Sequence, residues 1–210
     1  MYDIRPNIII GFHGCDTSVR DKLLTQPNDI EISAKPYDWS GNGMYFWENN
    51  IDRAWEWAND KASKKEIKNP AVIGAVIHLG QYCDFLDSKF TRLVKIYYEA
   101  MKQEYSLTGK QIPKNIDTRD DAHHDKLIRA LDCATIEFMH KDILKEHKRE
   151  MATKGFSEAK VFDSVRGAFS EGGPAFNGSG IFIKSHIQIC IRNMNCIKGF
   201  FIPRDKISFP

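Results

Sequence analysis

Residues 38–46 of this chain have the sequence Asp-Trp-Ser-Gly-Asn-Gly-Met-Tyr-Phe, in which a glycine-rich turn leads into an apolar strand. Gly41 and Gly43 permit a tight turn and a close approach between backbone and ligand, because neither carries a side chain. Tyr45 then offers an aromatic face to a flat ring. A hairpin turn followed by a core tyrosine fits the same pattern and is favoured for this segment alone. A phosphate-binding P-loop is excluded, since its lysine and Ser/Thr are absent.

Upstream of this segment, a short apolar strand is predicted over residues 7–12 and ends at His13-Gly14. A histidine at a strand end can hydrogen-bond a ligand hydroxyl, and the Gly14 backbone can pair with a planar amide. The alternative is a histidine whose hydrogen bonds are satisfied within the protein. Residues 25–42 contain two prolines and are predicted to form a long loop, which we expect to lie over a ligand cavity.

The rest of the pattern predicts an α+β domain. Helices are expected over 17–24 and over 51–67, the second with Asn50 or Asn49 before its first turn. Strands are expected over 43–47 and 71–79. Residues 85–155 hold two charged helical stretches, which we interpret as a helical insert that covers one face of the sheet. The stretches are 85–105 and 120–149. Strands are expected to return at 159–165, 181–184, 187–192 and 197–202, with a glycine-rich loop over 166–180.

The composition is that of one ordinary globular domain. The 210 residues are 42% hydrophobic and 28% charged, and the formal net charge of +2 is too small to mark a nucleic-acid binder by itself. The five cysteines form no CxxC pair, so we expect reduced thiols in a cytoplasmic protein without a membrane span. No metal site is predicted, because the histidines at 123–124 and within 137–147 lack ligand spacing.

Together these segments resemble the His–Tyr–Glu branch of the ADP-ribosyltransferase superfamily, which includes diphtheria toxin and the poly(ADP-ribose) polymerases. The resemblance rests on the order strand-His-Gly, then Gly-x-Gly-x-Tyr-Phe opening a helix, then x-I-F-I-x-x-x-I-Gln at 180–188. It covers roughly residues 7–80 and 159–203 and leaves the insert unexplained. It implies a split antiparallel β-sheet core within a single domain over 1–210.

The resemblance implies that NAD is bound as the substrate, with a role for each matching residue. His13 would bond a ribose hydroxyl, and the Gly14 backbone would hold the nicotinamide carboxamide. Tyr45 would stack on the nicotinamide ring, with Gly43 allowing the close approach.

The family's second stacking aromatic falls at Glu56 in this chain. We expect the neighbouring Trp57 or Trp55 to take its place. On an amphipathic helix, however, such tryptophans more often belong to the core.

The clearest departure concerns the catalytic glutamate, whose position, aligned on Gln188, is occupied by Gly180. Cleavage of the N-glycosidic bond builds positive charge on the ribose, which a carboxylate stabilises. Glu171 is our candidate, because it lies on the glycine-rich loop leading into the same strand. Such a residue is usually solvated surface, and Asp163 and Arg166 are the alternatives for a supporting role.

We therefore expect an NAD-dependent mono-ADP-ribosyltransferase that releases nicotinamide, acting as an intracellular bacterial toxin of a toxin–antitoxin or anti-phage system. The acceptor is expected to be nucleic acid such as RNA, by a slight preference, or protein; residues 141–160 contain six lysines or arginines. An antitoxin protein is an expected partner. Two alternatives stay open: an NAD glycohydrolase on the same fold, and a non-catalytic NAD- or ADP-ribose-binding module.

Overall fold

The computed structural model describes residues 8–118 and 122–204. Its helices are α1 (Thr17–Thr25), α2 (Ile51–Ser63), α3 (Ser88–Thr108) and α4 (Ala130–Lys154), with a short 3-10 turn, η1, at Met194–Cys196. Its strands are β1 (Ile8–Asp16), β2 (Met44–Glu48), β3 (Pro70–His78), β4 (Tyr82–Asp84), β5 (Asn115–Ile116), β6 (Ile128–Arg129), β7 (Ser164–Phe169), β8 (His186–Ile191) and β9 (Ile197–Phe201).

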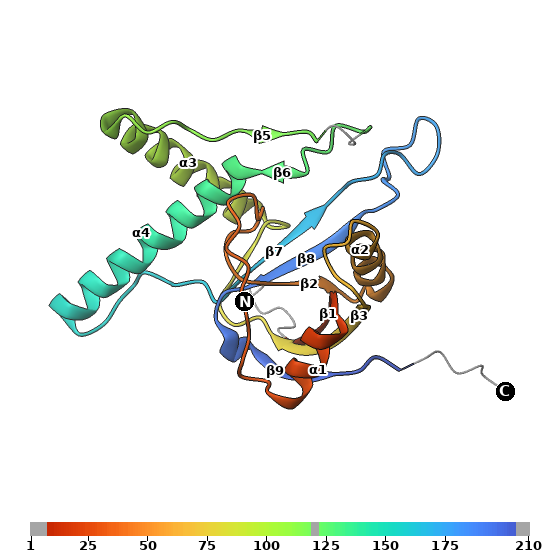
Figure 1. Cartoon of the computed structure of the whole chain (residues 1–210). Coiled ribbons are helices and arrows are strands. Elements are labelled where there is room, and N and C mark those ends of the chain that lie inside the picture. Colours follow the sequence, from red (N-terminus) through yellow and green to blue (C-terminus); the bar gives the residue numbers. More distant parts are fainter. Residues whose placement is uncertain (1–7, 119–121, 205–210) are drawn as a thin grey trace.

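Seven of these strands form one sheet in the order β4–β7–β8–β2–β1–β3–β9, and β5 pairs with β6 separately (Figure 1). Neighbouring strands of the large sheet are antiparallel except β4 and β7. The predicted α+β class is confirmed.

Local capping explains where the first two helices begin. The Asp16 carboxylate accepts the backbone N–H of Ser18 at 3.0 Å and also the backbone N–H groups of Lys68 and Asn69, so it ties the start of α1 to the start of β3. The Asn50 side chain accepts the backbone N–H of Arg53 at 3.0 Å, as expected for the start of α2. That helix ends at Ser63, earlier than predicted, and the chain turns just after it.

The two faces of the sheet carry different cores, because successive side chains of a strand point to opposite faces. On one face, Leu23 of α1 packs with Phe46 and Ile73. The other face carries two neighbouring apolar clusters. In the first of these, α2 covers Trp47 and Val72. The second cluster joins α4 to the sheet through Ile136, Met139, Val165 and Cys190.

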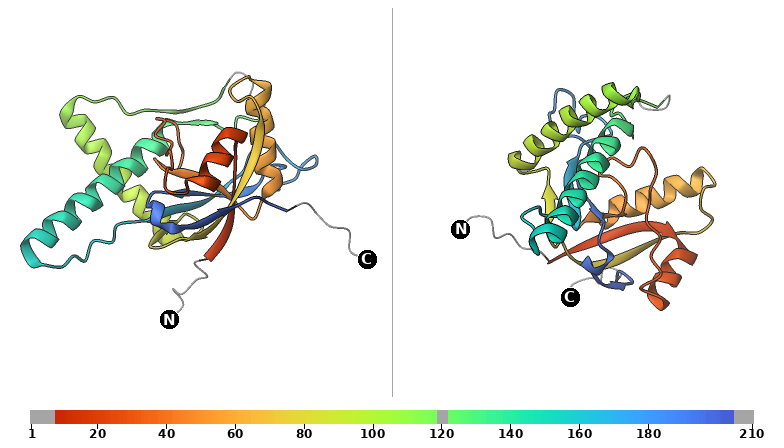
Figure 2. Two further views of the ribbon diagram at one scale, coloured as in Figure 1. Left: turned by 60° about the horizontal axis from the view of Figure 1, so that its bottom comes forward. Right: turned by 90° about the vertical axis from the view of Figure 1, so that its left-hand side faces the viewer.

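The predicted helical insert is present as α3 and α4, which lie side by side near the β4–β7 edge (Figure 1, Figure 2). Each begins later than expected, and the small β5–β6 pair between them was not predicted. No helix in the described ranges has the length and apolar character needed to cross a membrane.

Two predictions about the C-terminal strands were wrong. The strand expected at 159–165 begins only at Ser164, as β7, and continues to Phe169 because its residues pair in register with β8. The strand expected at 181–184 is not part of the sheet, and only an isolated bridge joins Phe182 to Pro174. Ile181 and Ile183 are exposed, so this apolar run does not contribute to the core.

The five cysteines are all free and buried. Burial raises the pKa of the Cys83 and Cys190 thiols to about 12. They stay protonated at neutral pH and act as small apolar core side chains.

Candidate functional site

Strand β1 is paired along its whole length with β3, from Ile8 opposite His78 to Asp16 opposite Pro70. With β2 it pairs only at Gly11 and Phe12. The two strands therefore separate after Phe12. A cavity of about 630 Å³ is lined by the residues on both sides of this split.

The six leading candidates for the site line this one cavity, although they come from four separate parts of the chain. They are His13, Gly14, Gly43, Tyr45, Trp57 and Glu171. The loop over residues 25–42 also lines it, through Glu31, Ser33 and Trp39 among others, as predicted.

The Gly14 backbone faces the split. The carbonyl oxygen of Ile10 accepts the backbone N–H of Asn49 at 3.0 Å, so Ile10 directs its backbone groups toward the β2 side. Alternate residues of a strand direct these groups the same way, and Gly14 lies four residues on. A Cβ at Gly14 would overlap the carbonyl oxygen of Ala54 in α2. Glycine is thus needed for helix packing and leaves its N–H and C=O at the cavity.

The half-buried His13 imidazole is held across the split, with Nδ1 2.8 Å from the carbonyl oxygen of Tyr45. Burial lowers the pKa of His13, and the hydrogen bond only partly opposes this. The ring is therefore neutral at neutral pH, and Nδ1 donates to the carbonyl oxygen. Its Nε2 is left as an acceptor for a ligand hydroxyl.

Tyr45 lines the cavity and also packs against the apolar cluster beneath α4. Its hydroxyl donates to the carbonyl oxygen of Gly41 at 2.6 Å and accepts the backbone N–H of Ser40 at 3.2 Å. Gly41 adopts a φ of 82°, which few other residues tolerate. The glycine turn therefore holds the Tyr45 hydroxyl in place. Part of the Tyr45 side chain belongs to the apolar core and part lines the cavity.

Helix α2 presents a stripe of three side chains to the cavity: Arg53, Trp57 and Lys61. Their i, i+4, i+8 spacing places them on one face of the helix. The Trp57 ring lies 6.4 Å from the His13 ring, whereas Trp55 is 40% exposed. Of the two tryptophans, Trp57 is the one at the cavity. Arg53 and Lys61 were not predicted from the sequence, although their spacing of four residues on either side of Trp57 places them on its face of the helix.

Glu171 is anchored and does not sit on a free loop. Its carbonyl oxygen accepts the backbone N–H of Lys184 at 3.0 Å, which extends the β7–β8 pairing past Phe169. The next residue, Gly172, donates its N–H to the Asp125 carboxylate at 2.8 Å. The Glu171 side chain is 11% exposed and forms an ion pair with Arg53.

The other acidic and basic candidates do not reach the cavity. Asp163 accepts the backbone N–H of Gln81 at 2.8 Å and a bond from Asn193 at 2.7 Å. Arg166 pairs with Glu48 and Asp84 on the opposite face of the sheet. Neither lines the cavity, so the supporting role considered for them was wrong.

Gly180, the position aligned with the family glutamate, is exposed and lies outside every strand. A Cβ there would meet nothing within 4 Å. Its lack of a side chain therefore has no bearing on the cavity, which Glu171 reaches from the end of β7.

Two buried donors of the cavity wall have no hydrogen-bond partner among the described residues: Trp47 Nε1 and Arg53 Nε. Buried polar groups are rarely left unpaired, so each calls for an explanation. A polar ligand in the cavity would supply acceptors. Nearby, His186 stacks on Phe169 at 5.3 Å, and burial lowers its pKa to about 4.

Comparison with protein-family models, curated proteins and solved structures found no match to this chain. The chemistry of the cavity is therefore the basis for assigning a function.

Proposed function

We propose that this protein is an NAD-dependent mono-ADP-ribosyltransferase with an ADP-ribosyltransferase-like fold. One observation carries the proposal: His13, Gly14, Tyr45, Trp57 and Glu171 line a single cavity of about 630 Å³. That volume is typical of small-molecule sites, which measure about 300–1,000 Å³.

The nicotinamide end of NAD fits the split between β1 and β2. The Gly14 N–H and C=O can pair with both halves of a carboxamide. The rings of Tyr45 and Trp57 provide flat surfaces for the nicotinamide. The free Nε2 of His13 accepts a hydroxyl of the ribose.

The α2 stripe supplies positive charge for the pyrophosphate. Arg53 has an unpaired Nε donor, and the Lys61 ammonium lies 5.5 Å from the Trp57 ring. Guanidinium groups suit phosphate because their donors form a planar fork. Both cations also form ion pairs, Lys61 with Glu66 at 2.6 Å and Arg53 with Glu56 and Glu171. Arg53 is the stronger candidate because its buried Nε donor has no other partner among the described residues.

The reaction breaks the bond between ribose C1′ and the nicotinamide nitrogen, which keeps the electron pair and leaves as neutral nicotinamide. Positive charge develops on the ribose, and the Glu171 carboxylate stabilises it. A lone pair of the acceptor then forms the new bond to C1′, and the acceptor loses a proton. Arg53 is a positioning residue, since its ion pair orients the carboxylate.

Incubation of the protein with NAD labelled in the adenine ring, in the presence of cell extract, tests the proposal. Mass spectrometry should find ADP-ribose attached to RNA or protein, together with free nicotinamide. Free ADP-ribose alone would indicate an NAD glycohydrolase, and unreacted NAD would indicate a binding module; either result would overturn the transferase assignment.

We also propose that the enzyme acts as an intracellular bacterial toxin. Induced expression should arrest growth of a bacterial host, and Glu171→Gln should relieve the arrest at equal protein level. Equal arrest by both forms would contradict this role.

A further inference from the structure

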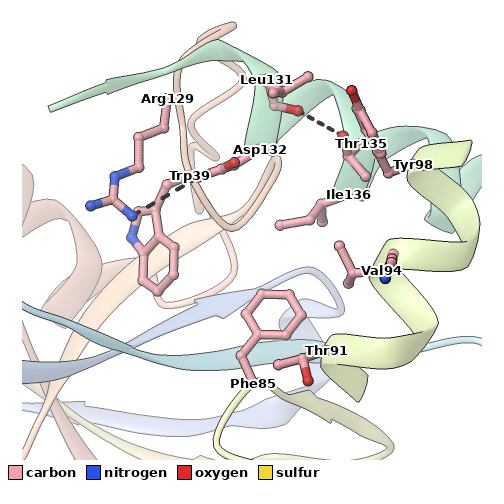
Figure 3. A pocket seen from close by; sticks show the side chains of 11 residues that line it. Trp39, Phe85, Thr91, Val94, Tyr98, Arg129, Leu131, Asp132, Thr135 and Ile136 are labelled. Atoms are coloured by element: carbon pink, nitrogen blue, oxygen red, sulfur yellow. Dashed lines mark hydrogen bonds and ion pairs between the residues drawn. The ribbon is translucent and has the colours of Figure 1, made fainter. Parts of the chain in front are cut away.

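A second cavity, of about 420 Å³, lies between the sheet edge and the helices of the insert. Figure 3 shows Trp39 and Phe85 on the sheet side, with Val94 and Tyr98 of α3 and Ile136 of α4 on the helix side. Trp39 lines this cavity and the first one. The two cavities are therefore neighbours that share one indole ring.

Aromatic rings and cations surround this second cavity. Trp39, Phe85 and Tyr98 supply the rings. Lys95 and Arg129 supply positive charge, and Asp132, 3.9 Å from Arg129, is the one carboxylate among the described lining residues. The Arg129 guanidinium lies 5.7 Å from the Trp39 ring, within the range of a cation–π contact. Lys95 is exposed, and the ion pairs found within the described ranges do not include it.

The first half of α3 extends this positive charge along the surface. Residues 88–98 contain Lys89, Arg92 and Lys95 and no acidic residue, and the capping Asp87 lies 3.8 Å from Lys89. A polyanion that entered the cavity would therefore meet favourable charge along this part of the helix.

The polar groups of the cavity are largely committed to the protein. The Thr135 hydroxyl donates to the carbonyl oxygen of Leu131 at 2.8 Å, and the Thr91 hydroxyl donates to that of Ser88 at 3.0 Å. The Asp132 carboxylate accepts a bond from Asn115 at 2.7 Å. A ligand would thus be held by ring contacts and charge more than by hydrogen bonds to its edges.

We propose that this second cavity is the acceptor subsite and binds an unpaired base of a single-stranded nucleic acid, a proposal that rests on the proposed transferase function. Proteins hold single strands by stacking bases on aromatic side chains beside a positively charged surface, with little sequence preference. The cavity matches that description in its aromatic lining and in Lys95, which is outside the ion pairs of the described residues. Its other polar groups are bonded within the protein, which agrees with little sequence preference. The shared Trp39 ring sets the bound strand next to the ribose of NAD.

Binding of a fluorescein-labelled single-stranded RNA decamer of mixed sequence, followed by fluorescence anisotropy at low salt, tests this subsite. Lys95→Glu and Tyr98→Ala should each weaken RNA binding by about tenfold or more. The first change reverses a charge that faces the RNA backbone, and the second removes a ring on which a base stacks. Lys102→Glu is the matched control: it reverses an exposed charge on the same helix, outside the cavity, and should change affinity by less than about twofold.

Nicotinamide release from NAD without added RNA is measured on the same variants, and it should stay at the wild-type level because neither residue lines the NAD cavity. Circular dichroism checks that each variant is folded. If the wild type does not bind the decamer, if Lys102→Glu weakens binding as much as Lys95→Glu, or if only proteins become labelled in extract, the acceptor subsite is refuted. If the wild type does not release nicotinamide from NAD, the proposed function is refuted instead. Decamer binding can be measured in that case too, so the two failures are distinguishable.

Discussion

The two sides of strand β1 differ sharply. Toward β3 the ladder is complete, and Ile73 and Ile77 of that neighbour are fully buried. Toward β2 the ladder stops after Phe12, and the gap leaves His13 and Gly14 at a cavity. One strand is thus fully paired on its closed side and lines a cavity on its open side. Substitutions on the closed side should change stability, and those on the open side should change NAD chemistry.

The largest expected effect is on the open side, at Glu171. Glu171→Gln keeps the size of the side chain and removes its charge, so nicotinamide release should fall by about a hundredfold or more while NAD still binds. Glu31→Gln is the matched control, since Glu31 is an exposed carboxylate at the rim of the same cavity. Turnover by Glu171→Gln at the wild-type rate would remove Glu171 from the mechanism.

On the closed side, Ile73→Ala should lower the free energy of unfolding by about 2–5 kcal/mol, because Ile73 is fully buried and the change leaves a cavity. The rate of nicotinamide release per folded molecule should not change. Ile8→Ala, at an exposed position of β1, should have an effect below about 0.5 kcal/mol. Chemical denaturation gives the energies. A loss of turnover in folded Ile73→Ala would mean that the two sides of β1 are coupled.

Acid should destabilise the fold through buried histidines away from the split. Burial lowers the pKa of His140 to about 3, below its ordinary value of 6.5. The unfolded chain therefore binds a proton that the folded chain does not, and stability falls as pH drops below about 6.5, by up to about 1.4 kcal/mol per pH unit. His140→Phe should make this dependence less steep between pH 6 and 4, and His186 should account for part of the slope that remains; denaturation at each pH will measure both slopes. An unchanged slope would contradict the assignment.

The smallest effect is expected from the tryptophans of α2. Trp57→Ala should weaken NAD binding by about 0.5–1.5 kcal/mol, the contribution of ring stacking, and Trp55→Ala should not. Both changes remove the same side chain from the same helix, so helix propensity does not distinguish them. Equal affinities in a calorimetric titration would show that Trp57 serves the core alone.

Local patterns were sufficient to predict much of the fold and several of the residues that line the cavity. The apolar strand near His13, the glycine turn before Tyr45 and the cap at Asn50 each depend on residues a few positions apart. Such signals are readable without knowledge of the tertiary structure. The predicted end of that strand at His13 was wrong, because β1 stays paired with β3 as far as Asp16.

The remaining features depend on contacts between distant residues. The Arg53–Glu171 pair joins positions 118 apart, and Asp125 of the insert holds Gly172. The extension of the β7–β8 pairing to Glu171 follows from strand register, which short apolar runs specify weakly. That is also why the exposed Ile181–Ile183 run was mistaken for a core strand.

A calorimetric titration of the folded wild-type protein with NAD tests the central claim most directly. We predict binding at one site, weakened by competition with nicotinamide and by Trp57→Ala, with no comparable binding of ATP. Absence of NAD binding to protein that circular dichroism shows to be folded would contradict the assignment of the split between β1 and β2 as an NAD site.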